Sequence, residues 1–153
     1  MPLTEIPPPL PHEQVQVIEA PVGKYRQHVR MGQHLSQADE PVDLGGENSG
    51  PNPYEFLLAA LGACTSMTLR MYADRKQMPL TRVAVDLRHR KIHAQDCAEC
   101  HAREGQLDQI ERVITLEGDL SDEQREQLLA IANKCPVHRT LTSEIRILSR
   151  LAE

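Results

Sequence analysis

The segment from Leu57 to Leu69 contains no charged residue, and it lies inside a longer segment, Tyr54 to Lys76, whose pattern predicts a helix. Pro53 suits the first helical turn, and Asn52 suits the capping position before it. A helix that faces water on one side carries charges along that side. We therefore expect this helix to be covered by protein on both sides.

Short segments with the alternation typical of strands lie on either side of this helix. Before it we expect strands at 15–18, 25–31 and 33–38, and after it strands at 82–92 and 110–116, a helix at 121–133 with a capping-box start, and a last strand at 144–151. The order is β-β-β, long helix, β-β, helix, β. Consecutive strands joined by turns pair antiparallel, which predicts the α+β class.

The chain has 153 residues, which is typical of a single domain, here 1–153. Five of its eleven prolines fall in the first eleven residues, so 1–13 is expected to be an extended proline-rich arm. The net charge of −5 argues against nucleic-acid binding. The apolar run 56–69 is too short to span a bilayer, and the first residues lack the pattern of a signal peptide. We expect a cytoplasmic protein that binds neither membrane nor nucleic acid.

The four cysteines are the residues most open to a chemical role, because in a reducing compartment cysteines more often serve chemistry or metal binding than stapling. Cys64 lies in the apolar helix, where a free cysteine by itself is usually a packed core residue. Cys135 precedes Pro136 and so occupies an N-cap-like position. Backbone N–H groups there, with His138 three residues on, would lower the pKa of a thiol.

The other two cysteines form the pattern H-x3-C-x2-C-H, made by His93, Cys97, Cys100 and His101. Two thiolates and two imidazoles could close a tetrahedral zinc site, and a Cys-x2-Cys pair could also act as a redox dithiol. The third interpretation is an exposed polar loop without chemistry, because a single Cys-x2-Cys is half a metal motif.

Two longer motifs, NPYEFLLAALGACTSMTLRMYADRK and ANKCPVHRTL, resemble the OsmC/Ohr family of thiol-dependent peroxidases. The resemblance covers nearly the whole chain after the proline arm and is closer to the broad OsmC-like branch. It implies an OsmC-like fold with an N-terminal β-meander, a two-helix core with an antiparallel sheet, and an intertwined homodimer with active sites at the subunit interface.

The resemblance also implies which residues act. Cys64 matches the peroxidatic cysteine and Cys135 the resolving one, and the family adds a Glu at the start of the helix and an Arg from the N-terminal strands. Glu55 is the candidate Glu, although the family's Glu directly follows Asn-Pro, where this chain has Tyr54. Arg26 and Arg30 are both candidates for the Arg.

The leading hypothesis is a peroxidase that reduces organic hydroperoxides through a Cys64 sulfenic acid and a Cys64–Cys135 disulfide. An external dithiol of the lipoyl or thioredoxin type would recycle it, with no cofactor or metal. The alternatives are a non-enzymatic binding protein that holds zinc in the 93–101 loop, and a redox sensor or disulfide carrier that uses Cys97 and Cys100. Under the leading hypothesis, Cys97 and Cys100 are dispensable for peroxide reduction.

Overall fold

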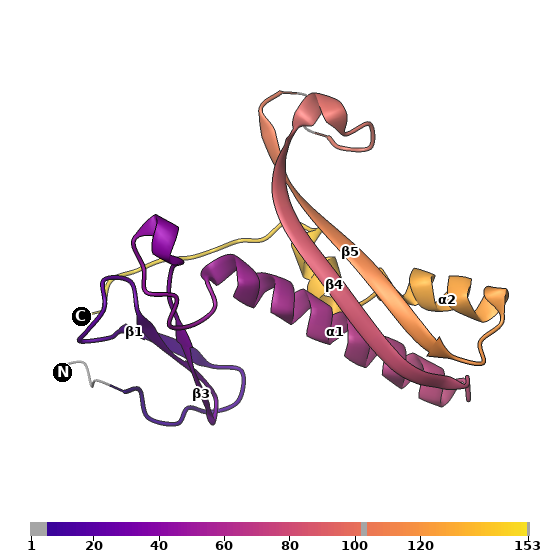
Figure 1. The fold of residues 1–153 in the computed structure, drawn as a ribbon, viewed down its shortest axis with the longest axis horizontal. Helices are drawn as coiled ribbons and strands as arrows, with labels where there is room; N and C mark the ends of the chain where they lie inside the picture. The colour runs from indigo at the N-terminus through magenta and orange to yellow at the C-terminus, as the bar shows by residue number, and fades with distance from the viewer. Residues whose placement is uncertain (1–5, 102–103, 153) are drawn as a thin grey trace. The chain divides into compact units, whose positions relative to one another are not determined.

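The computed structural model describes residues 6–101 and 104–152 (Figure 1). The chain divides into two compact units, 1–57 and 58–153, and each is described by itself. Both units contain antiparallel strands together with helical segments, so the predicted α+β class is confirmed. The prediction of a single domain over 1–153 stays a prediction.

The first unit is built on a three-stranded meander of β1 (Val15–Glu19), β2 (Gln27–Met31) and β3 (His34–Ala38). Neighbouring strands pair antiparallel in the order β1-β2-β3, as expected. The described part of the proline arm contacts this meander. The Leu10 N–H donates to the Gly32 carbonyl at 3.0 Å, and Arg30 Nε donates to the Pro7 carbonyl at 2.9 Å.

The loop after β3, which contains the short 3-10 helix η1 (Val42–Leu44), is organised by one buried carboxylate. Asp39 accepts hydrogen bonds from the backbone N–H groups of Glu40, Glu47 and Ser49 and from the Ser49 hydroxyl, all within 3.1 Å. The Ser49 backbone N–H is the main cause that lowers the pKa of Asp39. The carboxylate therefore stays ionised at neutral pH and fixes the path of the loop into the long helix.

The long helix α1 (Pro53–Arg75) begins as predicted. The Glu55 N–H donates to Asn52 Oδ1 at 2.9 Å, and the Asn52 N–H donates to Glu55 Oε2 at 2.8 Å, which makes a reciprocal cap. One face of α1 is buried, and its members are spaced four residues apart: Leu61, Thr65, Leu69 and Ala73.

The other side of α1 is not covered within one chain. Met67 and Met71 are 63% and 62% exposed, and Ala63 is exposed beside them. The expectation that protein covers both sides of α1 concerns the homodimer, and it stays a prediction. By length and composition α1 is the one helix in the described residues that could cross a membrane. Its buried face packs against the hairpin and α2 in the core of the second unit.

The second unit pairs two long antiparallel strands, β4 (Leu80–His93) and β5 (Gln106–Gly118), joined by a loop that contains the 3-10 helix η2 (Ala94–Asp96). The helix α2 (Asp122–Ala132) follows, with the predicted capping box between Ser121 and Gln124. A cluster of buried side chains joins α1, the hairpin and α2, and its members are Leu69, Ala73, Leu80, Leu120, Leu128 and Ala132.

The predicted last strand at 144–151 is wrong. A six-residue helix α3 (Pro136–Leu141) follows α2, and 144–152 contain neither helix nor strand. Alternating apolar residues form a strand only where a neighbouring strand supplies hydrogen bonds and cover, and nothing described in this chain does so. Ile147 and Leu151 are 83% and 93% exposed as a result.

Candidate functional site

The structure brings Cys64 and Cys135 together, although they are far apart in the sequence. Cys64 is half-buried on α1, and Cys135 is buried at the N-cap of α3. Both are free thiols, and the neighbouring Cys64 side chain is one of the groups that lower the pKa of Cys135. Thr65, the residue after Cys64 on α1, lies with its Oγ1 3.8 Å from Cys135 Sγ.

Several hydrogen bonds converge on the Cys135 sulfur. The His138 N–H donates to Sγ at 3.3 Å, which confirms the predicted N-cap position, and Thr65 Oγ1 lies 3.8 Å from Sγ. Burial raises the pKa of the Cys135 thiol, but the bonds from the His138 N–H, Cys64, Thr65 and the Val137 N–H outweigh burial. The pKa of Cys135 is therefore lowered from its ordinary value, and this site favours a thiolate.

Arg112 on β5 reaches this cysteine pair through Thr65. One guanidinium nitrogen donates to Thr65 Oγ1 at 2.9 Å and to the Ala132 carbonyl at 3.2 Å. The other donates to Asn133 Oδ1 at 2.9 Å. One side chain thus holds α1 and the end of α2 in fixed positions around the two sulfurs.

The Thr65 hydroxyl has one proton and two acceptors. It lies 2.7 Å from the Leu61 carbonyl, the shorter of its two contacts, and 3.8 Å from Cys135 Sγ. Because Arg112 occupies an Oγ1 lone pair, the hydroxyl acts as a donor to one of these two groups. Rotation toward sulfur would stabilise a thiolate at Cys135.

Arg112 was missing from the sequence-based candidates, although the sequence carries a signal for it. It interrupts the apolar face that Ile110, Ile114 and Leu116 make on the strand. A charged residue on such a face needs partners when it is buried. The strand register explains how Arg112 reaches α1. Arg112 lies opposite Leu87 in the β4–β5 pair. Leu87 packs closely on Gly62 of α1, where an added Cβ would lie 2.7 Å from Leu87 Cδ1.

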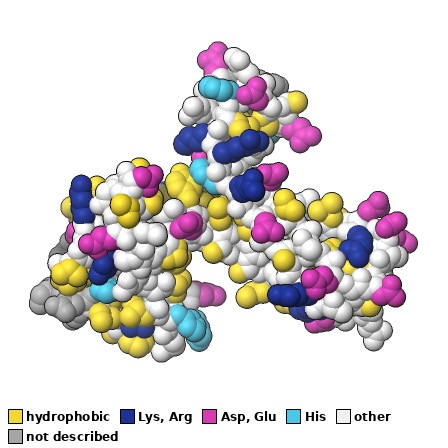
Figure 2. Space-filling model, in the orientation of Figure 1, with side chains coloured by type: hydrophobic (Ala, Val, Ile, Leu, Met, Phe, Trp, Pro, Cys, Tyr) yellow, Lys and Arg dark blue, Asp and Glu magenta, His cyan; other side chains and the backbone are white. Residues whose placement is uncertain are grey.

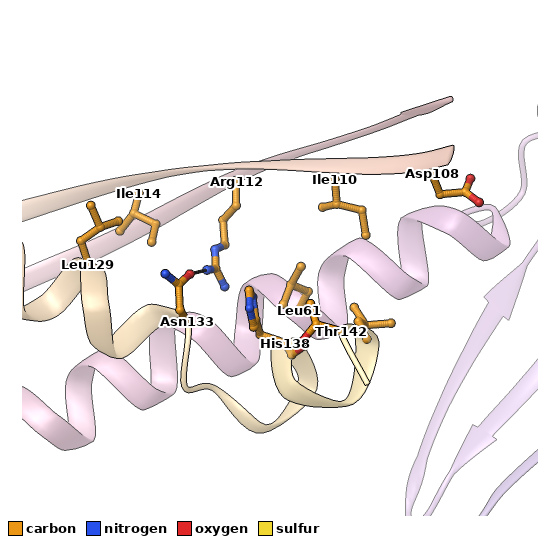
Figure 3. Close-up of a pocket in the computed structure, with 10 residues that line it drawn as sticks. Leu61, Asp108, Ile110, Arg112, Ile114, Leu129, Asn133, His138 and Thr142 are labelled. Atoms are coloured by element: carbon orange, nitrogen blue, oxygen red, sulfur yellow. Dashed lines mark hydrogen bonds between the residues drawn. The ribbon is translucent and has the colours of Figure 1, made fainter. Parts of the chain in front are cut away.

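A pocket of about 410 Å³ lies beside Arg112 in the second unit. Figure 3 shows Arg112 and His138 side by side at this pocket, between apolar side chains. Its apolar lining consists of Leu61, Ile110, Ile114, Leu129 and Leu141. Burial and the charge of Arg112 both lower the pKa of His138, so the imidazole is neutral at pH 7.

The other predicted site residues are engaged within the first unit. Glu55 takes part in the cap of α1. Arg26 pairs with Glu47 at 2.6 Å and donates to Ser49 Oγ, while Arg30 donates to the carbonyls of Pro7 and Gln33. The roles proposed for these three residues at Cys64 stay predictions.

Cys97 and Cys100 are bonded to each other in a disulfide in the loop between β4 and β5. Their sulfurs are therefore not available as zinc ligands in this state. His93 and His101 are exposed on either side of the pair, and the described residues contain no group of three or more side chains that could hold a metal ion.

The family model for the OsmC-like protein matches residues 46–149. An organic hydroperoxide resistance protein OsmC from Legionella pneumophila has a TM-score of 0.62 and 20% identity, over 84% of this chain and 88% of that one. An OsmC-like protein from Mycoplasma pneumoniae has a TM-score of 0.59 and 16% identity, over 84% and 87%. The organic hydroperoxide resistance protein OhrB of Bacillus subtilis has a TM-score of 0.57 and 18% identity, over 84% and 89%.

No curated protein sequence matches the chain. The structures named above are less than 25% identical to it, so they establish the fold alone. The family model covers more than half of the chain and includes both Cys64 and Cys135. The chain therefore belongs to the OsmC-like protein family.

Proposed function

We propose that this protein is a cysteine-based peroxidase that reduces organic hydroperoxides with Cys64 and Cys135. The observation that carries this proposal is the pair itself: a half-buried thiol beside a buried thiol whose pKa is lowered. The accessible sulfur can meet a peroxide, and the buried sulfur lies beside it as a thiolate that can resolve the oxidised product. Solved relatives named for organic hydroperoxide resistance support the same class of reaction.

The first step oxidises Cys64. Cys64 first releases its proton to water; Cys135, whose pKa is lowered, is a weak base and does not take that proton. The Cys64 thiolate then attacks the distal oxygen of R–O–OH, and the O–O bond breaks. Sulfur takes the hydroxyl group as Cys64–SOH, and the leaving alkoxide takes a proton to become the alcohol.

The second step forms the disulfide. Cys135 attacks the sulfur of Cys64–SOH, the S–O bond breaks, and the hydroxide leaves as water after protonation. The hydrogen bonds from His138 N–H and Thr65 favour the thiolate that this attack requires. An external dithiol of the lipoyl or thioredoxin type then restores both thiols by exchange through a mixed disulfide.

The pocket beside Arg112 supports an organic substrate. Five of its ten lining residues are aliphatic, and its volume of about 410 Å³ suits a small alkyl or acyl chain. Hydrogen peroxide would gain nothing from such walls. Arg112 lines the pocket and also donates a hydrogen bond to Thr65, so it links the proposed substrate pocket to the residues around Cys135.

Arg112 is a positioning residue in this scheme. It acts through the Thr65 hydroxyl, which it holds beside Cys135, and through its bonds to the end of α2. The N-terminal Arg26 or Arg30, with Glu55, would activate Cys64 in a homodimer that also covers the exposed side of α1. We further propose a cytoplasmic location, where a reducing pool keeps the two thiols free.

The test is peroxide consumption with a dithiol reductant. Wild-type protein should consume an organic hydroperoxide catalytically and hydrogen peroxide more slowly. The Cys64→Ser and Cys135→Ser variants should lose turnover. Wild-type protein that consumes no peroxide while both thiols are reduced would overturn the proposal.

The dimer is tested separately, by sedimentation at micromolar concentration. A dimer is the expected species, because the apolar side of α1 is uncovered in one chain. A stable monomer under these conditions would refute it.

A further inference from the structure

We propose that the Cys97–Cys100 pair is a second redox site, which exchanges its disulfide with protein dithiols and works independently of the Cys64/Cys135 site. The starting observation is the disulfide itself, between two cysteines three residues apart in the loop at the end of the β4–β5 hairpin. Two cysteines in this spacing within one turn form a dithiol that can open and close without a change in the fold.

The hairpin does not need this disulfide to keep its shape. The β4–β5 ladder continues to the last pair, His93 with Gln106, and the Ala94 N–H donates to the Gly105 carbonyl at 2.9 Å beyond it. These bonds already bring the two ends of the loop together. A covalent bond between two residues of the same turn therefore adds little to the structure, unlike a disulfide that joins separate elements.

The pair is accessible to another protein. Cys97 and Cys100 are half-buried, and Ala98 and Glu99 between them are exposed. Figure 1 shows this loop at the far end of the hairpin, and Figure 2 shows charged side chains of both signs over that end. Such a projecting, polar tip suits brief encounters with a soluble protein rather than a permanent interface.

The pair is too far from the other cysteines to exchange with them in the same chain. The tip begins at Gln106, six residues along β5 from Arg112, which marks the level of the Cys64/Cys135 site. Six residues of strand span about 20 Å. The loop pair must therefore take its electrons from outside the chain and pass them outside the chain.

The exchange transfers two electrons in two steps. One thiolate of an incoming dithiol attacks one sulfur of the Cys97–Cys100 bond, which breaks and releases the other cysteine as a thiolate. The second thiolate of the incoming dithiol then breaks the mixed disulfide. The loop gains two electrons and two protons, and the partner leaves as a disulfide. The reverse sequence lets the reduced loop reduce a protein disulfide.

The test uses the full chain with Cys64→Ser and Cys135→Ser, so that only the loop pair reacts. The protein is equilibrated with mixtures of reduced and oxidised dithiothreitol, quenched with an alkylating agent, and analysed by mass spectrometry. We expect complete and reversible conversion without denaturant, with a change in Tm below about 3 °C. The same variant should accelerate the reduction of insulin disulfides by dithiothreitol severalfold, compared with the fourfold cysteine variant.

Three outcomes would overturn the proposal. The disulfide could resist reduction until the protein is unfolded, or its reduction could lower Tm by 10 °C or more; either would make it a structural staple. The reduced loop could bind one zinc ion per chain, added as the free metal, and stop exchanging, which would make it a metal site. None of these three outcomes depends on peroxidase activity, so the failure of this proposal and the failure of the proposed function can be told apart.

Discussion

The two cysteine pairs of this protein are placed in opposite ways. Cys97 and Cys100 are neighbours in the sequence, bonded to each other, and carried on a projecting loop. Cys64 and Cys135 come from different helical segments, remain free, and meet where buried groups hold them. Close spacing in the sequence can by itself bring two sulfurs together, whereas a lowered thiol pKa requires surroundings that only the folded chain supplies.

The sharpest test of this contrast removes each pair in turn. We expect Cys64→Ser to lower peroxide turnover by at least about 10³-fold, because the attacking sulfur is lost. The double variant Cys97→Ser, Cys100→Ser is the matched control and should stay within twofold of wild type. Turnover is followed by peroxide loss with a dithiol. If the control variant lost its turnover, the loop would be catalytic and the contrast would fail.

The order of oxidation within the buried pair is the next prediction. With one equivalent of an organic hydroperoxide, Cys135→Ser should accumulate a sulfenic acid on Cys64, detected by a dimedone adduct and mass spectrometry. Serine is a good N-cap residue, so this variant should keep α3 in place.

Cys64→Ser should remain unreacted in the same experiment, because Cys135 is buried. A sulfenic acid on Cys135 in this variant, formed at the wild-type rate, would reverse the assignment of the two cysteines.

A smaller effect is expected from the groups that tune Cys135. Thr65→Val removes a hydrogen bond that lowers the pKa of Cys135, and Arg112→Gln removes the contact that positions the Thr65 hydroxyl, so the pKa of Cys135 should rise in both variants. The rate should then fall about tenfold near pH 7 and recover at higher pH, where the thiol ionises without help.

The pH profile of peroxide consumption is the measurement, and Arg125→Gln is the control. Arg125 donates to the carbonyls of Leu116 and Gly118 and touches neither sulfur. Its loss should change stability and leave the profile in place. Unshifted profiles for both Thr65→Val and Arg112→Gln would show that the pair is not tuned by these side chains.

The smallest effect concerns stability. The pKa of His138 is lower in the folded chain than in the unfolded chain, through burial and the charge of Arg112. The unfolded chain therefore binds its proton first as the pH falls, and the fold loses stability below about pH 6.5. Urea unfolding between pH 8 and pH 5 should show a weaker loss in His138→Gln than in wild type. Equal losses would contradict the assignment.

Much of the fold could be predicted from local pattern. The meander, α1, the hairpin and α2 all begin near their predicted residues, because alternation and caps act over a few neighbours. The predicted strand at 144–151 failed for the opposite reason. The apolar and polar residues do alternate in this segment, but a strand also needs a neighbouring strand to pair with. The residues of the segment do not indicate whether such a strand is present.

In the candidate site, too, the features set by neighbouring residues could be predicted, and those set by distant residues could not. The N-cap position of Cys135 could be predicted because Pro136, the next residue, suits the first position of a helix. The structure confirms this position. The Arg112–Thr65 contact joins residues 47 positions apart, so no local rule could find it. In the sequence, only the break in the apolar face of β5 indicated that Arg112 has a partner. No sequence pattern indicated that Asp39 organises the loop after β3.

The separation of Cys64 from Cys135 has a consequence for the unfolded chain. A bond between them would close a loop of about 70 residues, which removes far more freedom from the unfolded chain than the short loop of Cys97 and Cys100. On the chain-entropy scale the difference is about 4 kcal/mol against about 2 kcal/mol. The oxidised form of the buried pair would thus melt at a higher temperature than the reduced form, so that a thermal scan alone would report how far the pair has been oxidised.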